Sequence, residues 1–332
     1  MASETLETKA TLHELDAVLE NVHSSQRANR DGAVATYIPE LARAEPDAFG
    51  LAIATVGGRI HTAGDVEIPF TLQSVSKAFA FCLALELAGR DKVLARVGVE
   101  PSGDAFNAIV FDPVTNRPFN PMVNAGAITI AGMLDEIAGD SAFDLMLDRF
   151  SQAAGRRLSL DETVYRSEAE TGHRNRGIAH LLRASGALTG RTEDAVDLYF
   201  RQCSISATAT DLARMGATLA NMGENPSTGR TAFDLGAVRN TLAVMFTCGM
   251  YDYAGHWAYD VGIPAKSGVS GGIVGIVNRQ LGIASYSPRL DAKGNSVRGI
   301  AAFGMLSDEL GLHAFDCTNR GSAFVSTLID DA

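Results

Sequence analysis

The chain has 332 residues, of which 46% are hydrophobic and 20% are charged. This composition is typical of a globular protein, and the length allows one large domain or two modest ones. The formal net charge of −11 excludes the basic field that drives non-specific binding to nucleic acid or to anionic membranes. A reaction or binding event that involves a small molecule is therefore the natural expectation.

The amino-terminal segment "MASETLETKATLHELDAVLENV" carries early acids and no basic stretch followed by an apolar run. We therefore expect no secretory signal, and a cytoplasmic protein. The apolar run from Ala78 to Leu85 is much shorter than the roughly 20 residues that a membrane span needs. We expect a soluble protein.

The cysteines and histidines give no metal-binding pattern. The four cysteines are widely separated, and the seven histidines show no H-E-x-x-H spacing. In a cytoplasmic protein, buried thiols are expected rather than disulfides. We expect neither a metal nor a cofactor. The cysteines are Cys82, Cys203, Cys248 and Cys317.

The first predicted elements are a helix and a hairpin. Leu12, Leu15, Val18, Leu19 and Val22 recur at helical spacing and predict an amphipathic helix. Residues 49–64, "FGLAIATVGGRIHTAG", contain two β-prone runs around a Gly-Gly pair, which predicts an antiparallel hairpin with a tight turn.

Residues 74–250 are predicted to be mainly helical, because alanine- and leucine-rich stretches alternate there with loops that contain glycine and proline. After them, 271–288 and 295–307 are predicted as strands joined by the turn "RLDAKGN", and 320–331 as a covering helix.

Strands at both ends of the chain, with helices between them, predict an α/β fold of the α+β kind. We expect one antiparallel sheet, completed by both ends and flanked by helices, with a helical lobe inserted. The expected organisation is a single catalytic domain over 1–332, with a sheet-containing lobe at about 1–73 and 251–332 and a helical lobe at about 74–250. The cleft between the lobes is the expected site.

The segment "FTLQSVSKAFAFCLALELAGR" places Lys77 three residues after Ser74, at the start of an apolar helix. This spacing brings the hydroxyl and the amine to one face. Burial would lower the pKa of the amine and let it act as a base toward Ser74. We expect Lys77 to be neutral in the resting site. The alternative is that Ser74 caps the helix and Lys77 reaches solvent.

A second motif supports the catalytic interpretation. In "IPAKSGVSGGIVGIV", Lys266, Ser267 and Gly268 precede β-prone residues, which is the order expected of a Lys-Ser/Thr-Gly strand that partners a Ser-x-x-Lys motif. The glycine would let a substrate approach the strand, and the N–H of Val269 could join that of Ser74 in an oxyanion hole. The alternative is a solvated lysine in a glycine-rich turn.

Further segments follow in a fixed order over nearly the whole chain: "ATYIPELA", "QSVSKAF", "FNPMVNAGAI", "SEAETGHRNRGIAHLL", "YFRQCSI", "CGMYDYAG", "PAKSGVSGGI" and "SPRLDAKGNSVRG". In these segments the chain resembles the serine-dependent glutaminases, which share the fold of β-lactamases and penicillin-binding transpeptidases. The resemblance implies hydrolysis of L-glutamine to L-glutamate and ammonia through a glutamyl ester, without a cofactor. It also implies a homodimer or homotetramer.

The resemblance implies roles for individual residues. Ser74 would be the nucleophile, Lys77 its base and Tyr251 a second proton-transfer group. The substrate-binding residues would be Tyr37, Gln73, Asn124, Glu168, Asn175, Tyr199 and, through its backbone, Val269.

These residue types also suit an amino-acid substrate. Glu168 could hold an α-ammonium group, while the neutral amides and phenols offer hydrogen bonds to a carboxylate. Taken singly, each has another interpretation: Asn124 could cap a helix, Glu168 could be a solvated acid, and Tyr199 could be a core aromatic.

Two glycine-containing segments do not fit nucleotide binding. "GENPSTGR", residues 223–230, lacks the Gly-Lys-Ser/Thr ending of a phosphate loop and is interpreted as a surface turn. "GGIVG" does not have the dinucleotide-binding pattern.

Two rival functions remain open. One is a β-lactamase or peptidoglycan peptidase that uses the same serine and lysine. The other is a catalytically silent amino-acid sensor of the same fold.

Overall fold

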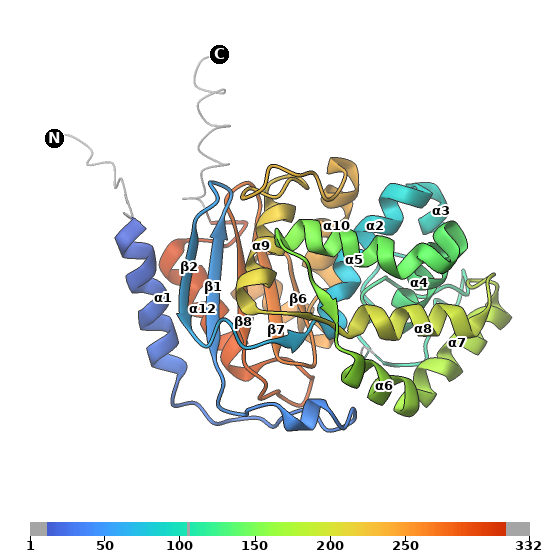
Figure 1. Ribbon diagram of the computed structural model, residues 1–332, viewed down its shortest axis with the longest axis horizontal. Helices are drawn as coiled ribbons and strands as arrows, with labels where there is room; N and C mark the ends of the chain where they lie inside the picture. Colours follow the sequence, from blue (N-terminus) through green and yellow to red (C-terminus); the bar gives the residue numbers. More distant parts are fainter. Residues whose placement is uncertain (1–11, 105–106, 317–332) are drawn as a thin grey trace, which may run out of the picture.

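The structure is a computed structural model that describes residues 12–104 and 107–316. Its main sheet has five antiparallel strands in the order β2-β1-β8-β7-β6 (Figure 1). The strands are β1 (Gly50–Thr55), β2 (Ile60–Gly64), β6 (Ala265–Ser267), β7 (Gly272–Val277) and β8 (Leu281–Tyr286). The pairing of β1 with β8 confirms that both ends of the chain complete one antiparallel sheet.

The predicted hairpin is formed by β1 and β2, which pair from Gly50 opposite Gly64 to Ala54 opposite Ile60. Gly58 in the turn has a φ of 83°, a conformation that glycine adopts without steric cost. The strands 272–277 and 281–286 confirm the predicted pair after the helical region.

The sheet is covered on both faces. Leu51 and Ile53 point into a core shared with α1 (Leu12–Gln26), α11 (Ala254–Asp260) and α12 (Val297–Leu310). Ala52 and Ala54 point to the opposite face, into a core shared with α9 (Ala209–Ala220). This alternation is the period of two that a strand imposes on its side chains.

Within residues 12–104 and 107–316, eight further helices form a layer on the side of α9 that faces away from the sheet and from α1 (Figure 1). Together with α9 they confirm that the middle of the chain is mainly helical. They are α2 (Ser76–Ala88), α3 (Arg90–Leu94), α4 (Asn124–Ala138), α5 (Ala142–Ala154), α6 (Glu162–Thr171), α7 (His173–Ser185), α8 (Thr192–Cys203) and α10 (Leu235–Cys248).

A second, three-stranded sheet lies between this layer and the turn that carries Ser74. Its strands are antiparallel, in the order β3 (Phe70–Thr71), β5 (Ile205–Ala207) and β4 (Ser159–Leu160). It was not predicted, because strands of two or three residues leave too short a pattern in the sequence.

The predicted strand over 295–307 is wrong, because this segment forms helix α12. The hydroxyl oxygen of Ser296 accepts a hydrogen bond from the N–H of Gly299 and caps the helix. Ala302, Phe303 and Leu306 then lie on one buried face at helical spacing. The continuous apolar run "GIAAFGML" fits both the period of a strand and the period of a helix, and the Ser296 cap favours the helix.

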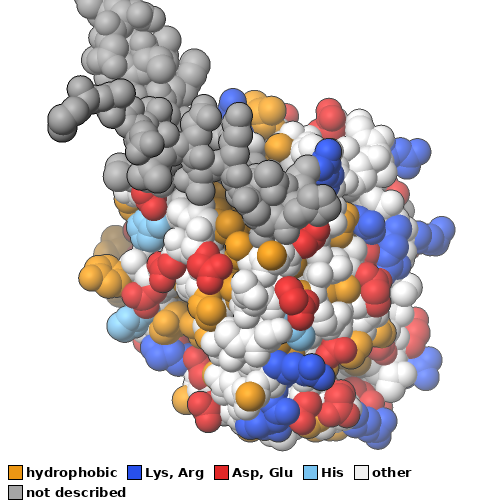
Figure 2. Space-filling model, turned by 90° about the vertical axis from the view of Figure 1, so that its left-hand side faces the viewer, with side chains coloured by type: hydrophobic (Ala, Val, Ile, Leu, Met, Phe, Trp, Pro, Cys, Tyr) orange, Lys and Arg blue, Asp and Glu red, His pale blue; other side chains and the backbone are white. Residues whose placement is uncertain are grey.

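Other expectations have simple outcomes. The first helix is confirmed and continues to Gln26. The helix predicted for 320–331, like Cys317, lies outside the described residues. The other three cysteines are buried free thiols, as expected. In the described part of the face that carries α1, acidic and basic side chains are interspersed (Figure 2). No helix among the described residues is long and apolar enough to cross a membrane.

Candidate active site

Ser74 lies in a strained turn between a strand and a buried helix. The backbone N–H of Leu72 still pairs with Ile205, at 2.8 Å from its oxygen, and the 3₁₀ helix η2 (Gln73–Val75) leads into α2. Gln73 has a φ of 46°, a left-handed conformation that costs a non-glycine residue about 1–2 kcal/mol. Backbone strain of this kind is concentrated at functional sites.

Lys77 does not reach solvent, because it is only 1% exposed. Its Nζ donates to Oδ1 of Asn124 at 2.6 Å and to the carbonyl oxygen of Met122 at 3.3 Å. Burial lowers the pKa of Lys77 to about 8, although the nearby acidic groups of Cys203 and Glu168 oppose the shift. The expected lowering of the pKa is confirmed. The expectation of a neutral amine holds only above about pH 8, since at pH 7 an amine with this pKa is mostly protonated.

Asn124 connects Lys77 to two other helices. Its Oδ1 also accepts a hydrogen bond from the Tyr199 hydroxyl at 3.3 Å, and its Nδ2 donates to Oδ1 of Asn175 at 3.0 Å. Asn124 is not the cap of α4, because the N-cap residue is Val123. The structure therefore brings α2, α4, α7 and α8 together at this amide.

Glu168 is buried in α6 and its Oε2 atom has no hydrogen-bond partner among the described residues. Burial raises the pKa of Glu168 to about 8, while a hydrogen bond with Gln73 and the charge of Lys77 act in the opposite direction. It is therefore not the solvated acid of the alternative interpretation. A buried carboxyl group with an unpartnered oxygen, hydrogen-bonded to the residue before Ser74, is suited to receive a cationic group.

Tyr251, which is far from Ser74 in the sequence, places its phenol next to the Ser74 hydroxyl. It begins the 3₁₀ helix η4 (Tyr251–Tyr253), and its φ of 58° is again left-handed. Its hydroxyl donates to the carbonyl oxygen of Ser267 at 3.1 Å and hydrogen-bonds Ser74. The Ser74 bond lowers the pKa of Tyr251, but burial is the larger effect and raises it above its ordinary value. The phenol is therefore neutral and able to pass a proton.

Lys266 packs against the ring of Tyr251. Its Nζ lies 4.0 Å from the centroid of the Tyr251 ring and donates to the carbonyl oxygen of Ser267 at 2.6 Å. The predicted alternative of a solvated lysine is wrong, because Lys266 is fully buried. Burial, followed by the charge of Lys77, lowers the pKa of Lys266 well below its ordinary value.

Strand β6 ends close to the turn of Ser74. A Cβ atom on Gly268 would lie 2.9 Å from the carbonyl oxygen of Leu72, so only glycine allows the two backbones to approach. The Val269 side chain packs in a small core with Ile38 and Leu290. In the described part of the chain, the Val269 N–H has no hydrogen-bond partner and is free to serve as a donor.

Tyr37 precedes Ile38 of this small core, and its side chain as a whole is 55% exposed. The pKa of its hydroxyl is nevertheless raised, first by burial and then by the nearby ionisable groups of Glu168 and Tyr251. This electrostatic effect is what links Tyr37 to the other predicted site residues. Sequence reasoning missed Gln202 and Ser76, whose buried side chains hydrogen-bond beneath the turn. Gln202 follows Tyr199 by three residues in "YFRQCSI", which was a usable signal.

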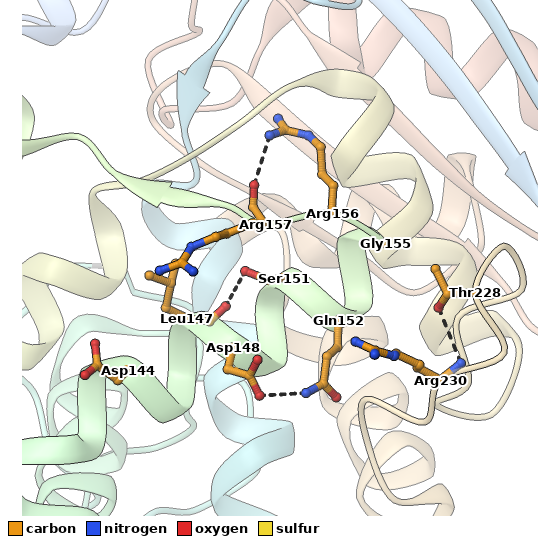
Figure 3. A pocket seen from close by; sticks show the side chains of 10 residues that line it. All are labelled: Asp144, Leu147, Asp148, Ser151, Gln152, Gly155, Arg156, Arg157, Thr228 and Arg230. Carbon is orange, nitrogen blue, oxygen red and sulfur yellow. Dashed lines mark hydrogen bonds between the residues drawn. The ribbon is translucent and has the colours of Figure 1, made fainter.

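A separate cavity of about 460 Å³ lies along α5 (Figure 3). Arg156, Arg157 and Arg230 line it together with Asp144 and Asp148. The guanidinium group of Arg156 donates to Asp211 at 2.6 Å. None of the predicted site residues line this cavity. In the described ranges, no three His, Cys, Asp or Glu side chains are grouped to hold a metal ion.

Comparison with known proteins agrees with the geometry around Ser74. The family described as "Glutaminase" matches residues 32–315. The chain belongs to the glutaminase family. A glutaminase of Trichormus variabilis is 50% identical over 300 residues, which cover 90% of each chain. Glutaminase 2 of Bradyrhizobium diazoefficiens is 52% identical over 295 residues, which cover 89% of this chain and 47% of that protein.

Solved structures of glutaminases have the same fold. The probable glutaminase ybaS superposes with a TM-score of 0.87 at 36% identity and covers 92% of this chain and 99% of its own. Mglu in its tris and glutamate form gives a TM-score of 0.88 at 43% identity, over 92% of this chain and 68% of that chain. This glutaminase family member therefore has the β-lactamase-like fold and is an amidohydrolase, as the resemblance implied.

Proposed function

We propose that this glutaminase hydrolyses the side-chain amide of L-glutamine to L-glutamate and ammonia through an ester of Ser74. The observation that carries the proposal is the buried cluster in which Ser74 hydrogen-bonds Tyr251 and Lys77 is held by Asn124 at 2.6 Å. The family supports the substrate, since its members in this comparison are glutaminases.

In the proposed acylation, the Ser74 oxygen attacks the amide carbon and its proton passes to Lys77, directly or through the Tyr251 hydroxyl. The low pKa of Lys77 supports this role, because a base is most effective when its pKa is near the working pH. The negative oxygen of the tetrahedral intermediate would be stabilised by the N–H groups of Ser74 and Val269.

The tetrahedral intermediate then collapses. The carbon–nitrogen bond breaks, and the nitrogen takes a proton relayed by Tyr251 or Lys77 and leaves as ammonia. Water adds to the glutamyl ester with the same groups as proton acceptors, and the ester bond to Ser74 breaks to release glutamate. The protons balance without a metal or cofactor entering any step.

Substrate recognition is proposed to use charge at one end and neutral hydrogen bonds elsewhere. Glu168 would receive the α-ammonium group, which would lower the pKa of its carboxyl group on binding. Its buried, unpartnered oxygen supports this role. The neutral groups would hold the carboxylate and amide through hydrogen bonds; they are Tyr37, Gln73, Asn124, Asn175, Tyr199 and Tyr251. Lys266, Ser267 and Gly268 would support the site from the strand edge.

The test compares purified Ser74→Ala with the wild-type protein in an ammonia-release assay on L-glutamine. We expect activity to fall by about 10³-fold or more, as when a nucleophile is removed. Ser307→Ala is the matched control, because Ser307 is a buried serine of α12 that donates to Val261 at 2.7 Å. Wild-type turnover by Ser74→Ala would exclude the proposed mechanism.

The two rivals make different predictions in the same experiment. A peptidase or β-lactamase would form a covalent adduct between Ser74 and a penicillin, which mass spectrometry would detect. A silent sensor would bind glutamine without releasing ammonia. L-Asparagine and D-glutamine, assayed beside L-glutamine, measure the selectivity that the site imposes.

The remaining parts of the proposal concern organisation. We place a single catalytic domain over 1–332, with the sheet-containing lobe at about 1–73 and 251–332 and the helical lobe at about 74–250, in a cytoplasmic homodimer or homotetramer. Light scattering on the purified protein tests the oligomeric state. Fractionation of expressing cells tests the location.

A further inference from the structure

Gln202 is a fully buried polar residue in the last turn of α8. Its Nε2 donates to the Ser76 hydroxyl oxygen at 3.0 Å. The Ser76 hydroxyl in turn donates to the carbonyl oxygen of Gln73 at 2.6 Å. Because a hydroxyl has a single proton, this arrangement requires the amide nitrogen of Gln202, rather than its oxygen, to face Ser76. The three groups form one directed chain.

The chain ends on the residue whose backbone is strained. Gln73 has a φ of 46° and immediately precedes Ser74. Its side chain donates to Thr71 at 3.3 Å and hydrogen-bonds Glu168, while its carbonyl oxygen accepts from Ser76. A left-handed residue of this kind persists only where its surroundings determine it. The hydrogen bond to the Gln73 carbonyl opposes relaxation of the turn.

Helix α8 also reaches the other half of the catalytic machinery. Tyr199 lies three residues before Gln202 on the same helix and donates to Asn124, which holds Lys77. The end of α8 continues into β5, whose Ile205 accepts the N–H of Leu72 at 2.8 Å. One rigid segment therefore contacts both the base and the turn of the nucleophile.

We infer that Gln202 is a positioning residue for Ser74, acting through the hydroxyl of Ser76. Gln202 does not touch the reacting atoms. It fixes the Gln73 carbonyl, and with it the direction in which the next residue presents its hydroxyl to Tyr251 and to the substrate. This inference rests on the proposed role of Ser74 as the nucleophile.

A purely structural role would have a different signature. A buried hydrogen bond that only stabilises the fold lowers the unfolding temperature and leaves kcat unchanged once the protein is folded. A positioning bond lowers kcat with little change in KM, since substrate contacts remain in place and only the reacting oxygen is displaced.

The experiment measures kcat and KM for L-glutamine, and the unfolding temperature, in Gln202→Met, Ser76→Ala and the double variant. Methionine matches the length of glutamine but cannot donate. We expect each single variant to lower kcat by about 10- to 100-fold, the range that a misplaced reacting group produces, with KM changed by less than about twofold. The kcat of the double variant should equal that of the less active single variant, because both substitutions break the same series of hydrogen bonds from Gln202 through Ser76 to Gln73.

Thr218→Val is the matched control. Thr218 is a fully buried residue of α9 whose hydroxyl donates to Ala153 at 2.9 Å. Among the described residues its hydroxyl donates only to carbonyl oxygens of α5 and α9, away from the turn of Ser74, so its loss should lower the unfolding temperature and leave kcat at the wild-type value.

Two outcomes would overturn the inference: wild-type kcat in both folded single variants, or effects on kcat that multiply in the double variant. If Gln202→Met does not fold, Ser76→Ala decides, because it removes one oxygen only. Ser74→Ala is assayed in parallel. If it retains activity, the proposed function fails; if it is inactive while the Gln202 and Ser76 variants turn over normally, only the positioning role fails.

Discussion

The candidate site contains two buried lysines, one from the helical layer and one from the edge strand of the sheet. The ionisable groups around the two amines differ. Lys77 is in α2 near the acidic groups of Cys203 and Glu168, which partly restore a pKa that burial lowers to about 8. Lys266 is in β6, where burial and the positive charge of Lys77 both act to lower its pKa.

The difference indicates how the two sides of the site divide the work. Burial lowers the pKa of both amines, and the kind of ionisable group nearby decides which one can still exchange a proton near neutral pH. Lys77, with a pKa of about 8, is that group. The pKa of Lys266 is lowered further by the charge of Lys77, and its Nζ donates to the carbonyl oxygen of Ser267, which also accepts a hydrogen bond from the Tyr251 hydroxyl. In the proposed mechanism the helical side would therefore accept the proton, and the sheet side would hold the phenol that relays it.

The largest expected effect comes from removing the proposed base, Lys77. Lys77→Met should lower kcat/KM for L-glutamine by about 10³-fold, within the range that a general base contributes. Ammonia release measures the change, and Lys92→Met in α3 is the exposed control. Activity within tenfold of the wild type would mean that the proton of Ser74 leaves by another route.

Tyr251→Phe tests the sheet side with a smaller change. The ring over Lys266 is kept, and only the hydroxyl that contacts Ser74 and Ser267 is lost. We expect kcat to fall by about 10²-fold, the lower end of the range for a proton-transfer group. Tyr253→Phe, two residues along in the same 3₁₀ helix, should retain wild-type activity. An equal fall in kcat in Tyr251→Phe and Tyr253→Phe would contradict a specific role of the Tyr251 hydroxyl in proton transfer.

Glu168→Gln tests whether the acidic side binds the substrate. Loss of a charge-assisted hydrogen bond, worth about 1.5–3 kcal/mol, should raise KM by about 10- to 100-fold. The exposed neighbour Glu170 gives the control variant Glu170→Gln. An unchanged KM would show that the α-ammonium group binds elsewhere.

The same variant should change the pH dependence of stability. The folded-state pKa of Glu168 is raised from 4.5 to about 8, so its contribution to stability is full below about pH 4.5 and is lost as the pH rises through about 8. Glu168→Gln has no such titration. The free energy of unfolding, measured in denaturant at pH 5 and pH 8, should therefore fall less in the variant than in the wild type. Equal falls would contradict the raised pKa.

The parts of the molecule that the sequence predicts are those with a local signal. The hairpin β1–β2 follows from alternation around Gly57 and Gly58, and the residues of the site occur in short motifs in a fixed order. Helix α12 was missed because its apolar run fits two periods; the local Ser296 cap, which accepts from Gly299 three residues along, is the signal that could have selected the helix.

The environment of each site residue could not be predicted in the same way. Lys77 and Lys266 are both lysines at the start of apolar segments, and the sequence does not say which acids or cations lie near them after folding. The partnership of Gln202 with Ser76 joins residues 126 positions apart. Contacts at such separation depend on how α8 packs on α2, for which no local pattern exists.

The smallest expected effect is the pH profile, and it separates the two groups whose pKa is about 8. If neutral Lys77 is the active form, kcat/KM should rise with pH through about 8 and then level off. Roughly a tenth of the enzyme would be active at pH 7. Ionisation of Glu168 in the free enzyme falls in the same window and raises kcat/KM in the same direction. In Glu168→Gln only the lysine titrates. A rise that persists in Glu168→Gln assigns the limb to Lys77, whereas a flat profile in that variant assigns it to substrate binding and contradicts Lys77 as the base.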